Sequence, residues 1–250
     1  MKGIILAGGS GSRLRPLTNT TNKHLLPVYD KPMIYYPIQT LKDAGITEIL
    51  VITSGEHAGN VFKLLGSGKD FGVKFTYRVQ DTAGGLPHAI ALAEGFVGND
   101  KFVSINGDNI LSDSVKPFVD AFANGKEASR ILLFETTPEE ARKAGVAIMQ
   151  GEKLTGFVEK PQNPPSNWIS IGFYMYTPDV FHVIRTLKPS ARGELEITDL
   201  HNHYLQRQTL TASKISGNWM DAGSFDELLR ANEEVRHWQI VKNMVQTPTK

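Results

Sequence analysis

Apolar positions along the chain follow two spacings, one typical of buried strands and one typical of amphipathic helices. The run Lys2–Ala7 is short, almost wholly apolar and directly followed by glycines, which predicts a buried parallel strand. Residues 32–44 carry apolar side chains at helical spacing before a glycine, which predicts a helix. Pro37 lies inside that segment, and we expect it to kink the helix or split it into two short pieces.

The segments that follow alternate between the two patterns up to residue 143. Strands are predicted over residues 47–53, 73–79, 101–106 and 128–135, and helices over 57–65, 86–94, 115–123 and 138–143. This alternation favours a doubly wound, mostly parallel sheet. Beyond Gly145, strands over 146–149, 154–159 and 169–176 follow one another through short turns, which predicts antiparallel additions. The prediction ends with helices over 178–187 and 196–207, a strand over 209–216, and a closing helix over 224–243 capped by Ser224.

Composition narrows the class of protein. At 250 residues and 40% hydrophobic content, the chain suits one large α/β unit with a sizeable core. A net charge of +1 gives no overall field for nucleic acid or an anionic membrane, and we expect neither as a partner. No apolar stretch is long enough to span a bilayer, and a cleavable leader would remove the first strand. The absence of cysteine excludes disulfides and thiolate metal sites, and we expect a cytoplasmic setting.

A glycine-rich loop follows the first predicted strand at residues 8–12. Three glycines in four residues let backbone N–H groups approach an anion, because no Cβ intervenes. Arg13, Arg15 and Lys23 then add the fixed positive charge that a polyphosphate needs. The loop lacks the lysine of the Walker pattern, and Leu14 stands at the third glycine of the dinucleotide fingerprint. Taken alone, a glycine turn with solvated arginines remains the alternative.

Two aspartates are candidates for carboxylate chemistry. Asp108 follows the strand 101–106, and Asp221 lies between the final strand and the final helix. Ligands bind outside the carboxyl ends of strands in open parallel sheets, so Asp108 should face the glycine loop. A lone aspartate after a strand is otherwise a turn or cap residue. The seven histidines form no metal cluster, since His201 and His203 are two apart on a predicted helix and point to different faces.

The start of the chain resembles a known signature. The segments LAGGSGSRLRPLT (6–18), NKHLLPV (22–28) and KPMI (31–34) are similar to the amino-terminal signature of sugar-1-phosphate nucleotidylyltransferases, most of all the short glucose-1-phosphate thymidylyltransferases. The resemblance implies an α/β fold: a Rossmann-like, mostly parallel central sheet flanked by helices, with antiparallel additions forming a sugar-binding half. It also implies one domain over residues 1–250, with a nucleotide-binding half at about 1–144 and a sugar-binding half with closing helices at about 145–250.

The resemblance also implies a set of site residues. Nucleotide binding falls to Leu6, Gly8, Gly9, Ser10, Gly11, Ser12, Arg13, Gln80, Gly85 and Asp108. Sugar-phosphate binding falls to Asn109, Gly145, Glu159, Lys160 and Arg192. Catalytic roles fall to Arg13, Lys23, Asp108 and Lys160. Asp108 and Asp221 would hold Mg²⁺, since two carboxylates plus substrate phosphates make a usual magnesium site.

Some of these assignments have plain structural alternatives. Gln80 carries an amide that suits the edge of thymine or uracil, but it could also be a polar turn residue. Glu159 and Lys160 could be a solvated pair after a strand. Glu194 or Glu196, beside Arg192, could hold the sugar or cap a helix.

Five positions depart from the family pattern: His24, Pro87, His88, Ala144 and Ile171. His24 stands where the family often has glutamine, and it would add a pH-dependent charge. We expect the other four to reshape the pocket for the sugar. Losing an aromatic at Ala144 should open space, and a larger Ile171 should fill some.

The reaction implied by the resemblance is nucleotidyl transfer from dTTP, with UTP second, to a sugar 1-phosphate with release of pyrophosphate. Glucose 1-phosphate is the expected sugar, and a different sugar 1-phosphate is the alternative. A catalytically idle subunit that senses nucleotide-sugars is a second alternative. The complete set Arg13, Lys23, Asp108, Lys160 and Asp221 argues against a sensor. We also expect a homo-oligomer.

Overall fold

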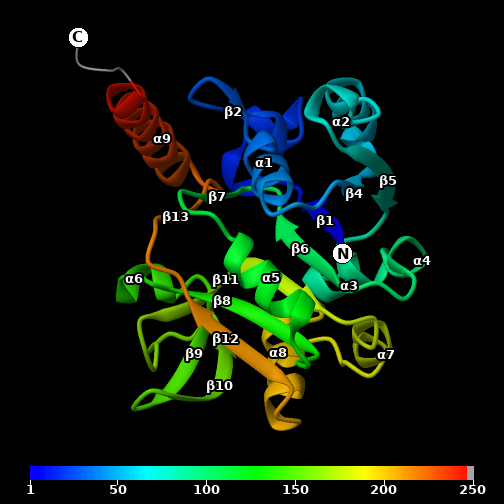
Figure 1. Cartoon of the computed structure of the whole chain (residues 1–250), viewed down its shortest axis with the longest axis vertical. Coiled ribbons are helices and arrows are strands. Elements are labelled where there is room, and N and C mark those ends of the chain that lie inside the picture. The colour runs from blue at the N-terminus through cyan, green and yellow to red at the C-terminus, as the bar shows by residue number, and fades with distance from the viewer. Residues whose placement is uncertain (247–250) are drawn as a thin grey trace.

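Nine strands form one mixed sheet in the computed structural model, which describes the backbone of residues 1–246 and the side chains of residues 1–240 (Figure 1). The strands are β1 (Lys2–Ala7), β4 (Glu48–Ser54), β5 (Lys74–Gln80), β6 (Phe102–Asn106), β8 (Ser129–Glu135), β9 (Gly145–Gln150), β10 (Lys153–Glu159), β11 (Trp168–Tyr176) and β12 (Leu210–Lys214). Their order is β10-β9-β11-β6-β1-β4-β5, with β8 paired to β11 and β12 paired to β8.

The amino-terminal half of the sheet is parallel. β1 pairs with β4 on one side and with β6 on the other, and β5 extends the sheet beyond β4. Ile4 and Ile5 are fully buried on opposite faces of β1, as the apolar run predicts. The chain leaves β1 toward β4 and later returns to its other side at β6. The gap beyond the carboxyl ends of β1 and β6 is therefore a topological switch point, where ligands bind in this class of sheet.

The carboxyl-terminal half is largely antiparallel, which confirms the predicted change of pattern. β11 is antiparallel to β6, β8 and β9, and β9 is antiparallel to β10. β12 is parallel to β8. Because β11 contacts strands of both halves, it joins them into one sheet.

The helices cover both faces of the sheet and one edge of the molecule (Figure 1). They are α1 (Tyr35–Asp43), α2 (Ala58–Leu65), α3 (Leu86–Ala91), α4 (Glu94–Val97), α5 (Lys116–Asn124), α6 (Pro138–Ala141), α7 (Val180–Ile184), α8 (Ile197–Gln206) and α9 (Phe225–Gln246). Short 3-10 helices span Ser12–Leu14, Leu17–Asn19, Lys23–Leu25, Gly55–His57 and Lys69–Phe71. Ser224 accepts a hydrogen bond from the backbone N–H of Glu227 at 3.4 Å, which confirms the predicted cap of α9.

Two helix predictions need correction. Pro37 does not kink or split its helix, because α1 begins at Tyr35 and places the proline in the first turn. A proline there costs nothing, since the first-turn N–H groups have no acceptor within the helix. The predicted helix over residues 86–94 is two short helices, α3 and α4.

Two small sheets were not predicted. One pairs β2 (Pro27–Val28) with β3 (Lys31–Pro32), and the other pairs β7 (Asn109–Leu111) with β13 (Trp219–Asp221). Strands of two or three residues are too short to show a repeating pattern of apolar positions. The β7–β13 pair matters most, because it joins residues more than 100 positions apart and sets Asp221 opposite Asn109.

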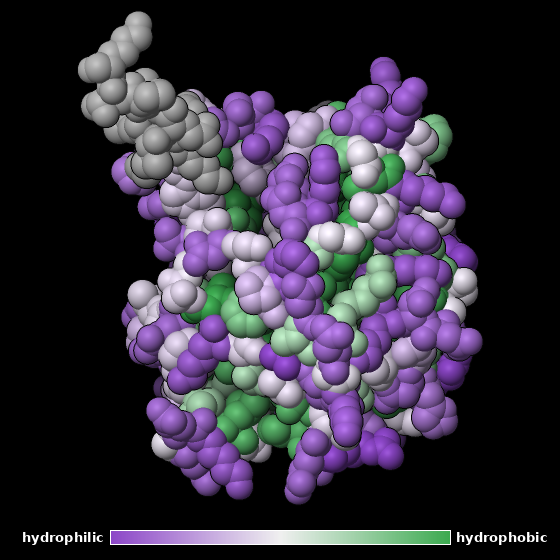
Figure 2. All heavy atoms as spheres, viewed as in Figure 1, coloured by the Kyte–Doolittle hydropathy of each residue, from purple (hydrophilic) through white to green (hydrophobic). Residues whose placement is uncertain are grey.

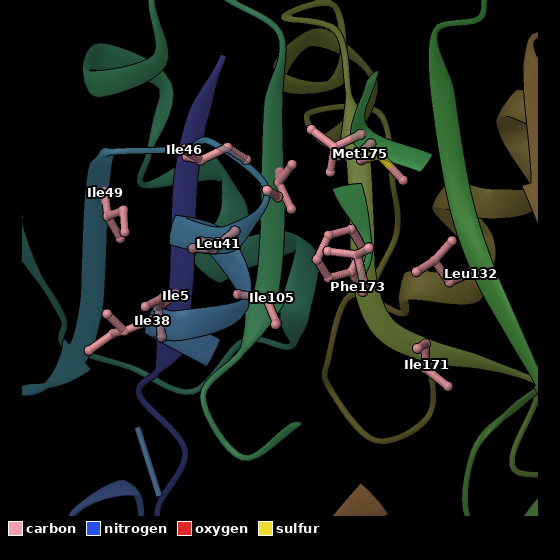
Figure 3. Close-up of a cluster of buried hydrophobic side chains, with 14 of the residues drawn as sticks. Ile5, Ile38, Leu41, Ile46, Ile49, Ile105, Leu132, Ile171, Phe173 and Met175 are labelled. Carbon is pink, nitrogen blue, oxygen red and sulfur yellow. The ribbon is translucent and has the colours of Figure 1, made fainter. Parts of the chain in front are cut away.

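The core lies on both faces of the sheet. On one face, Ile38 and Leu41 of α1 pack over Ile5 of β1 and Ile105 of β6 (Figure 3). Leu41 lies directly on the sheet, since a Cβ at Gly3 would come within 2.9 Å of its Cδ1. Outside the core, the face drawn in Figure 2 is largely hydrophilic, with apolar residues in small groups. None of the described helices is long and apolar enough to cross a membrane.

Leu41→Ala is expected to lower the free energy of unfolding by about 2–5 kcal/mol, because it leaves a cavity between α1 and β1. Leu229→Ala is the matched control, since Leu229 is also helical but 61% exposed. The control should change stability by no more than about 0.5 kcal/mol. Urea denaturation measures both, and equal losses would contradict the described core.

Candidate active site

The loops after β1 and β6 meet at the switch point of the sheet. The backbone N–H of Gly107 donates to the carbonyl of Leu6 at 2.9 Å, which fixes the two strand ends together. The glycine loop then turns through Gly11, whose φ of 63° favours glycine. Thr18 closes this turn by donating its hydroxyl hydrogen to the Gly11 carbonyl at 2.9 Å. Gly9, Ser10 and Ser12 are exposed, so the loop is open to an incoming ligand.

A carboxylate pair lies beside this loop. Because β13 is antiparallel to β7, Asp221 lies opposite Asn109, and the N–H of Ala222 donates to the carbonyl of Asp108 at 3.3 Å. Lys23 donates a hydrogen bond to Asp108 Oδ2. The structure thus brings together Lys23, Asp108 and Asp221 from three separate parts of the sequence.

The charges in this cluster do not balance. Burial works to lower the pKa of Lys23, but Asp108 and Asp221 outweigh it and raise the pKa above its usual value. Burial likewise works to raise the pKa of Asp108, but the Lys23 ammonium holds it at about 2. Burial, together with the Asp108 charge, raises the pKa of Asp221 to about 7. One lysine therefore compensates one carboxylate, and burial beside that carboxylate disfavours the ionised form of the second.

This donor set fits a hard divalent cation. Asp221 Oδ1 is buried and accepts no hydrogen bond from the described residues. An oxygen of this kind, next to a second carboxylate, is the ligand type that Mg²⁺ prefers. Within the described residues, no group of three or more histidines and acids could hold a metal. A bound ion would therefore complete its coordination with substrate phosphates and water, as magnesium usually does.

Arg13 extends toward the same cluster. A Cβ at Gly223 would lie 2.5 Å from Arg13 Nη2 and 2.7 Å from Asp221 Oδ1, so the two side chains meet over that glycine. Arg13 Nη1 also lies 3.7 Å from Oε2 of Glu227 in α9. The Arg13 side chain is 56% exposed, so its guanidinium is accessible to a ligand.

The predicted base-reading residues lie on the other side of the glycine loop. Gln80 ends β5, and its Oε1 would be 2.5 Å from a Cβ at Gly8. Its Nε2 is 3.2 Å from His88 Nδ1, so the amide lies between the loop and α3. Gly85 has φ of 89°, and a Cβ there would come within 2.1 Å of the Leu195 carbonyl. Gly85 therefore permits close contact with the loop that carries Arg192.

The predicted sugar-phosphate residues form a second charged cluster. Lys160 Nζ and Arg192 Nη2 each lie 3.7 Å from Glu159 Oε1. Arg192 also donates to both carboxylate oxygens of Glu196, at 3.1 and 2.6 Å. Glu196 thus holds the guanidinium rather than capping α8. Lys160 has φ of 43°, which is uncommon for a residue with a side chain and often marks a functional site.

Gly145 joins this cluster to the sheet. A Cβ at Gly145 would meet Thr198 Cγ2 at 2.7 Å, Ser170 Oγ at 3.0 Å and Glu159 Oε2 at 3.5 Å. Burial raises the pKa of the Tyr174 hydroxyl, and the charges of Glu159, Asp108 and Asp221 add to the increase. The two charged clusters therefore flank the same strand, β11.

Two predictions about departures from the family pattern are wrong. His24 adds no charge near neutral pH, because burial, reinforced by Lys23, lowers the pKa of His24 to about 3. Its ring instead bonds Asn22 Oδ1 at 2.6 Å. Ile171 is fully buried in the core, on the opposite face of β11 from Gly172 (Figure 3). Ile171 therefore does not reshape the polar face, whereas the expected effect of Ala144, a half-buried residue packed against the same cluster, stays a prediction.

Three polar residues and one contact were missed. Ser170 and Thr198 border Gly145, Asn106 ends β6 just before Gly107, and His88 contacts Gln80. His88 was singled out only as a departure near the base and sugar, without its partner. Asn106 could have been noticed as the one amide in an otherwise apolar strand end.

Comparison with known proteins agrees with this geometry. Enzymes that handle phosphate esters often combine a glycine loop with carboxylates at the carboxyl edge of a parallel sheet. The nucleotidyl transferase family matches residues 2–237. The low-salt glycan biosynthesis nucleotidyltransferase Agl11 of Haloferax volcanii is 43% identical over 237 residues, 94% of this chain and 66% of that protein. The glucose-1-phosphate thymidylyltransferase of Neisseria meningitidis is 40% identical over 247 residues, 98% of this chain and 85% of that protein.

Solved structures give the same result. A Bacillus anthracis protein assigned as a glucose-1-phosphate thymidylyltransferase, in complex with sucrose, is 53% identical with a TM-score of 0.90, over 94% of this chain and 95% of that one. A UDP-glucose pyrophosphorylase complexed with UDP-glucose is 28% identical with a TM-score of 0.83, over 94% and 98%. The chain therefore belongs to the nucleotidyl transferase family, and its relatives are enzymes.

The buried His24 should make folding stability depend on pH. Its pKa falls from about 6.5 in the unfolded chain to about 3 in the folded one, so only the unfolded state gains the proton as pH falls through this window. Stability is therefore full above pH 6.5 and decreases below it, by about 2 kcal/mol at pH 5 from this residue. His24→Gln should remove that share of the difference between pH 8 and pH 5. If urea denaturation gives the same difference in unfolding free energy between pH 8 and pH 5 for His24→Gln and wild type, His24 is not buried and neutral.

Proposed function

We propose that this protein transfers a nucleotidyl group from dTTP to glucose 1-phosphate and releases pyrophosphate. The observation that carries the proposal is the β7–β13 pair. It sets Asp221 beside Asp108 and Lys23 at the switch point, with a carboxylate oxygen that has no described partner. The named relatives support the reaction class.

The chemistry rests on positioning and charge. An oxygen of the sugar phosphate attacks the α-phosphorus in line while pyrophosphate leaves. Because that oxygen is already ionised, the reaction needs no general base, and rate comes from alignment and charge neutralisation. Lys23 has three N–H donors, of which one bonds Asp108, so two can point toward phosphate. Arg13 reaches the same cluster beside Gly223, and we assign both Lys23 and Arg13 to the departing pyrophosphate.

Each remaining cluster receives one task. Lys160 and Arg192 would bind the sugar phosphate, and Glu159 would accept hydrogen bonds from sugar hydroxyls. Asp108 and Asp221 would hold Mg²⁺, which supplies positive charge beside the α-phosphate when bound. These tasks divide a single catalytic domain into a nucleotide half, about 1–144, and a sugar half, about 145–250.

The nucleotide choice rests on Gln80 and Gly85. An amide between Gly8 and His88 offers donor and acceptor groups to the edge of a thymine or uracil base. UTP is the second candidate, and the fold shared with a UDP-glucose pyrophosphorylase favours keeping it. The proposed sugar is glucose 1-phosphate, because Ile171, one of the residues expected to alter its pocket, lies in the core instead.

We also propose a homo-oligomer in a cytoplasmic setting. The support is α9, which extends from the body of the molecule in Figure 1 and exposes Phe225 and Ile240. Isolated exposed apolar residues are ordinary, but two on one projecting helix suit contact with a second copy.

Asp108→Asn is expected to lower turnover about 100-fold or more while leaving the fold intact, because it keeps the shape but removes the charge. Asp113→Asn is the matched control, since Asp113 bonds Ser112 nearby but lies outside the cluster. Pyrophosphate release at saturating Mg²⁺ measures the loss, and circular dichroism checks the fold. A normal rate in Asp108→Asn would refute the assigned site, and no release by the wild-type protein would favour the idle sensor.

Gln80→Ala is expected to lower kcat/KM for dTTP about tenfold or more and to narrow the preference for dTTP over CTP. The reason is that a base edge left without its partner loses about 1–3 kcal/mol. Gln39→Ala is the control, because Gln39 bonds Asp43 on the exposed side of α1, away from the glycine loop. Equal wild-type turnover of dTTP, CTP and ATP would show that Gln80 does not read the base.

A further inference from the structure

Asn106 lies where the sugar would rest but has no assigned task. It is the last residue of β6, two positions before Asp108. In the β6–β11 pair, Ile105 opposes Phe173 and Ser104 opposes Tyr174, so Gly172 is the neighbour of Asn106 across the pair. Opposed residues of an antiparallel pair point to the same face of the sheet.

Gly172 leaves space that two amides occupy. A Cβ at Gly172 would lie 2.3 Å from Asn106 Nδ2 and 2.6 Å from Asn109 Nδ2. Asn109 comes from β7, so the two side chains approach the same glycine from different strands. Any larger residue at position 172 would displace both.

Each amide keeps a buried polar atom without a partner among the described residues. These atoms are Asn106 Oδ1, an acceptor, and Asn109 Nδ2, a donor. Asn109 itself is only 1% exposed, so bulk water does not readily compensate it. Buried polar groups normally have hydrogen-bond partners, and an unpartnered donor and acceptor on two amides that meet over one glycine indicate a missing ligand group.

The same face continues into the predicted sugar-phosphate cluster. Ser170 of β11 opposes Gly145 of β9, and Glu159 and Thr198 surround that second glycine. Gly172 and Gly145 thus form a floor without side chains, bordered by amide, hydroxyl and carboxylate groups. A hydroxyl is the group that fits Asn106 and Asn109, because it can donate to one and accept from the other.

We propose that Asn106 is a specificity-determining residue that binds one hydroxyl of the hexose together with Asn109. The proposal rests on the proposed function and adds which group of the substrate is recognised, namely one hexose hydroxyl. A sugar phosphate lacking that hydroxyl leaves both amides unpaired, and sites built to bind a hydroxyl discriminate strongly against analogues without it.

The test combines variants with substrates. Wild type, Asn106→Leu and Asn106→Ser are assayed with dTTP and glucose 1-phosphate, and with monodeoxy analogues that each lack one hydroxyl. Asn106→Leu should lower kcat/KM on glucose 1-phosphate at least tenfold. On one analogue, variant and wild type should agree within about threefold, because the lost partner is already absent. Asn106→Ser should show the same dependence on the analogue with a smaller loss of kcat/KM. It tests the proposal if the leucine variant does not fold.

Ser104→Ala is the matched control. Ser104 lies two residues deeper on the same strand and face, and its hydroxyl is also buried without a partner. Removing it should leave the analogue profile and the basal rate unchanged. The KM for dTTP should stay unchanged in the Asn106 variants, which a general disturbance of Asp108 would alter.

Four outcomes would overturn the proposal. If the Asn106 variants lose kcat/KM by the same factor on every analogue, Asn106 is a structural residue. If Ser104→Ala also alters the relative kcat/KM on the analogues, the effect is not specific to Asn106. If wild type uses glucose 1-phosphate but no analogue shows the expected coupling, this inference alone fails. If the wild-type protein releases pyrophosphate from dTTP equally well in the absence of any sugar phosphate, both this inference and the proposed function fail.

Discussion

Two carboxylates and one lysine, enclosed at the switch point of a parallel sheet, are the constraint around which the chain is arranged. Asp108 is only 6% exposed and forms its hydrogen bond with Lys23, while Asp221 has a buried oxygen without a described partner. Buried ions are destabilising unless compensated. The fold keeps this imbalance by returning its last strand, β13, across the molecule to β7. We infer that substrates and metal supply the missing compensation.

Two glycines leave space at the surface of the sheet beyond that cluster. Gly172 and Gly145 have no room for a Cβ. The amides of Asn106 and Asn109 approach the first glycine, and the Ser170 hydroxyl and the Thr198 methyl group approach the second. Each of these positions lies on a strand or helix rather than on a loop. A rigid support of this kind holds hydrogen-bonding groups in fixed positions, which selectivity for a sugar requires.

Sequence patterns predicted the fold well where elements are long. β1 was predicted with its observed bounds, and the change from parallel to antiparallel strands near Gly145 was found. The patterns did not predict features that depend on very short strands or on the face of a strand to which a residue points. β7 and β13 are three residues long and carry no periodic signal, yet they create the carboxylate pair. Ile171 was assigned to the wrong face because the direction of a strand's pleat cannot be read from one residue. The structure brings the predicted site residues together, whereas the roles assigned to them stay predictions.

The contact between Gly85 and the Arg192 loop has a kinetic consequence. The N–H of Leu195 donates to the carbonyl of Gly84 at 2.9 Å, so the segment that faces the base is tied directly to the segment that carries Arg192. Neither segment can shift without moving the other. We therefore expect the two substrates to bind interdependently, with the first to arrive shaping the site for the second. Initial rates measured against both concentrations would show this as a mutual dependence of the two KM values, and independent KM values would refute it.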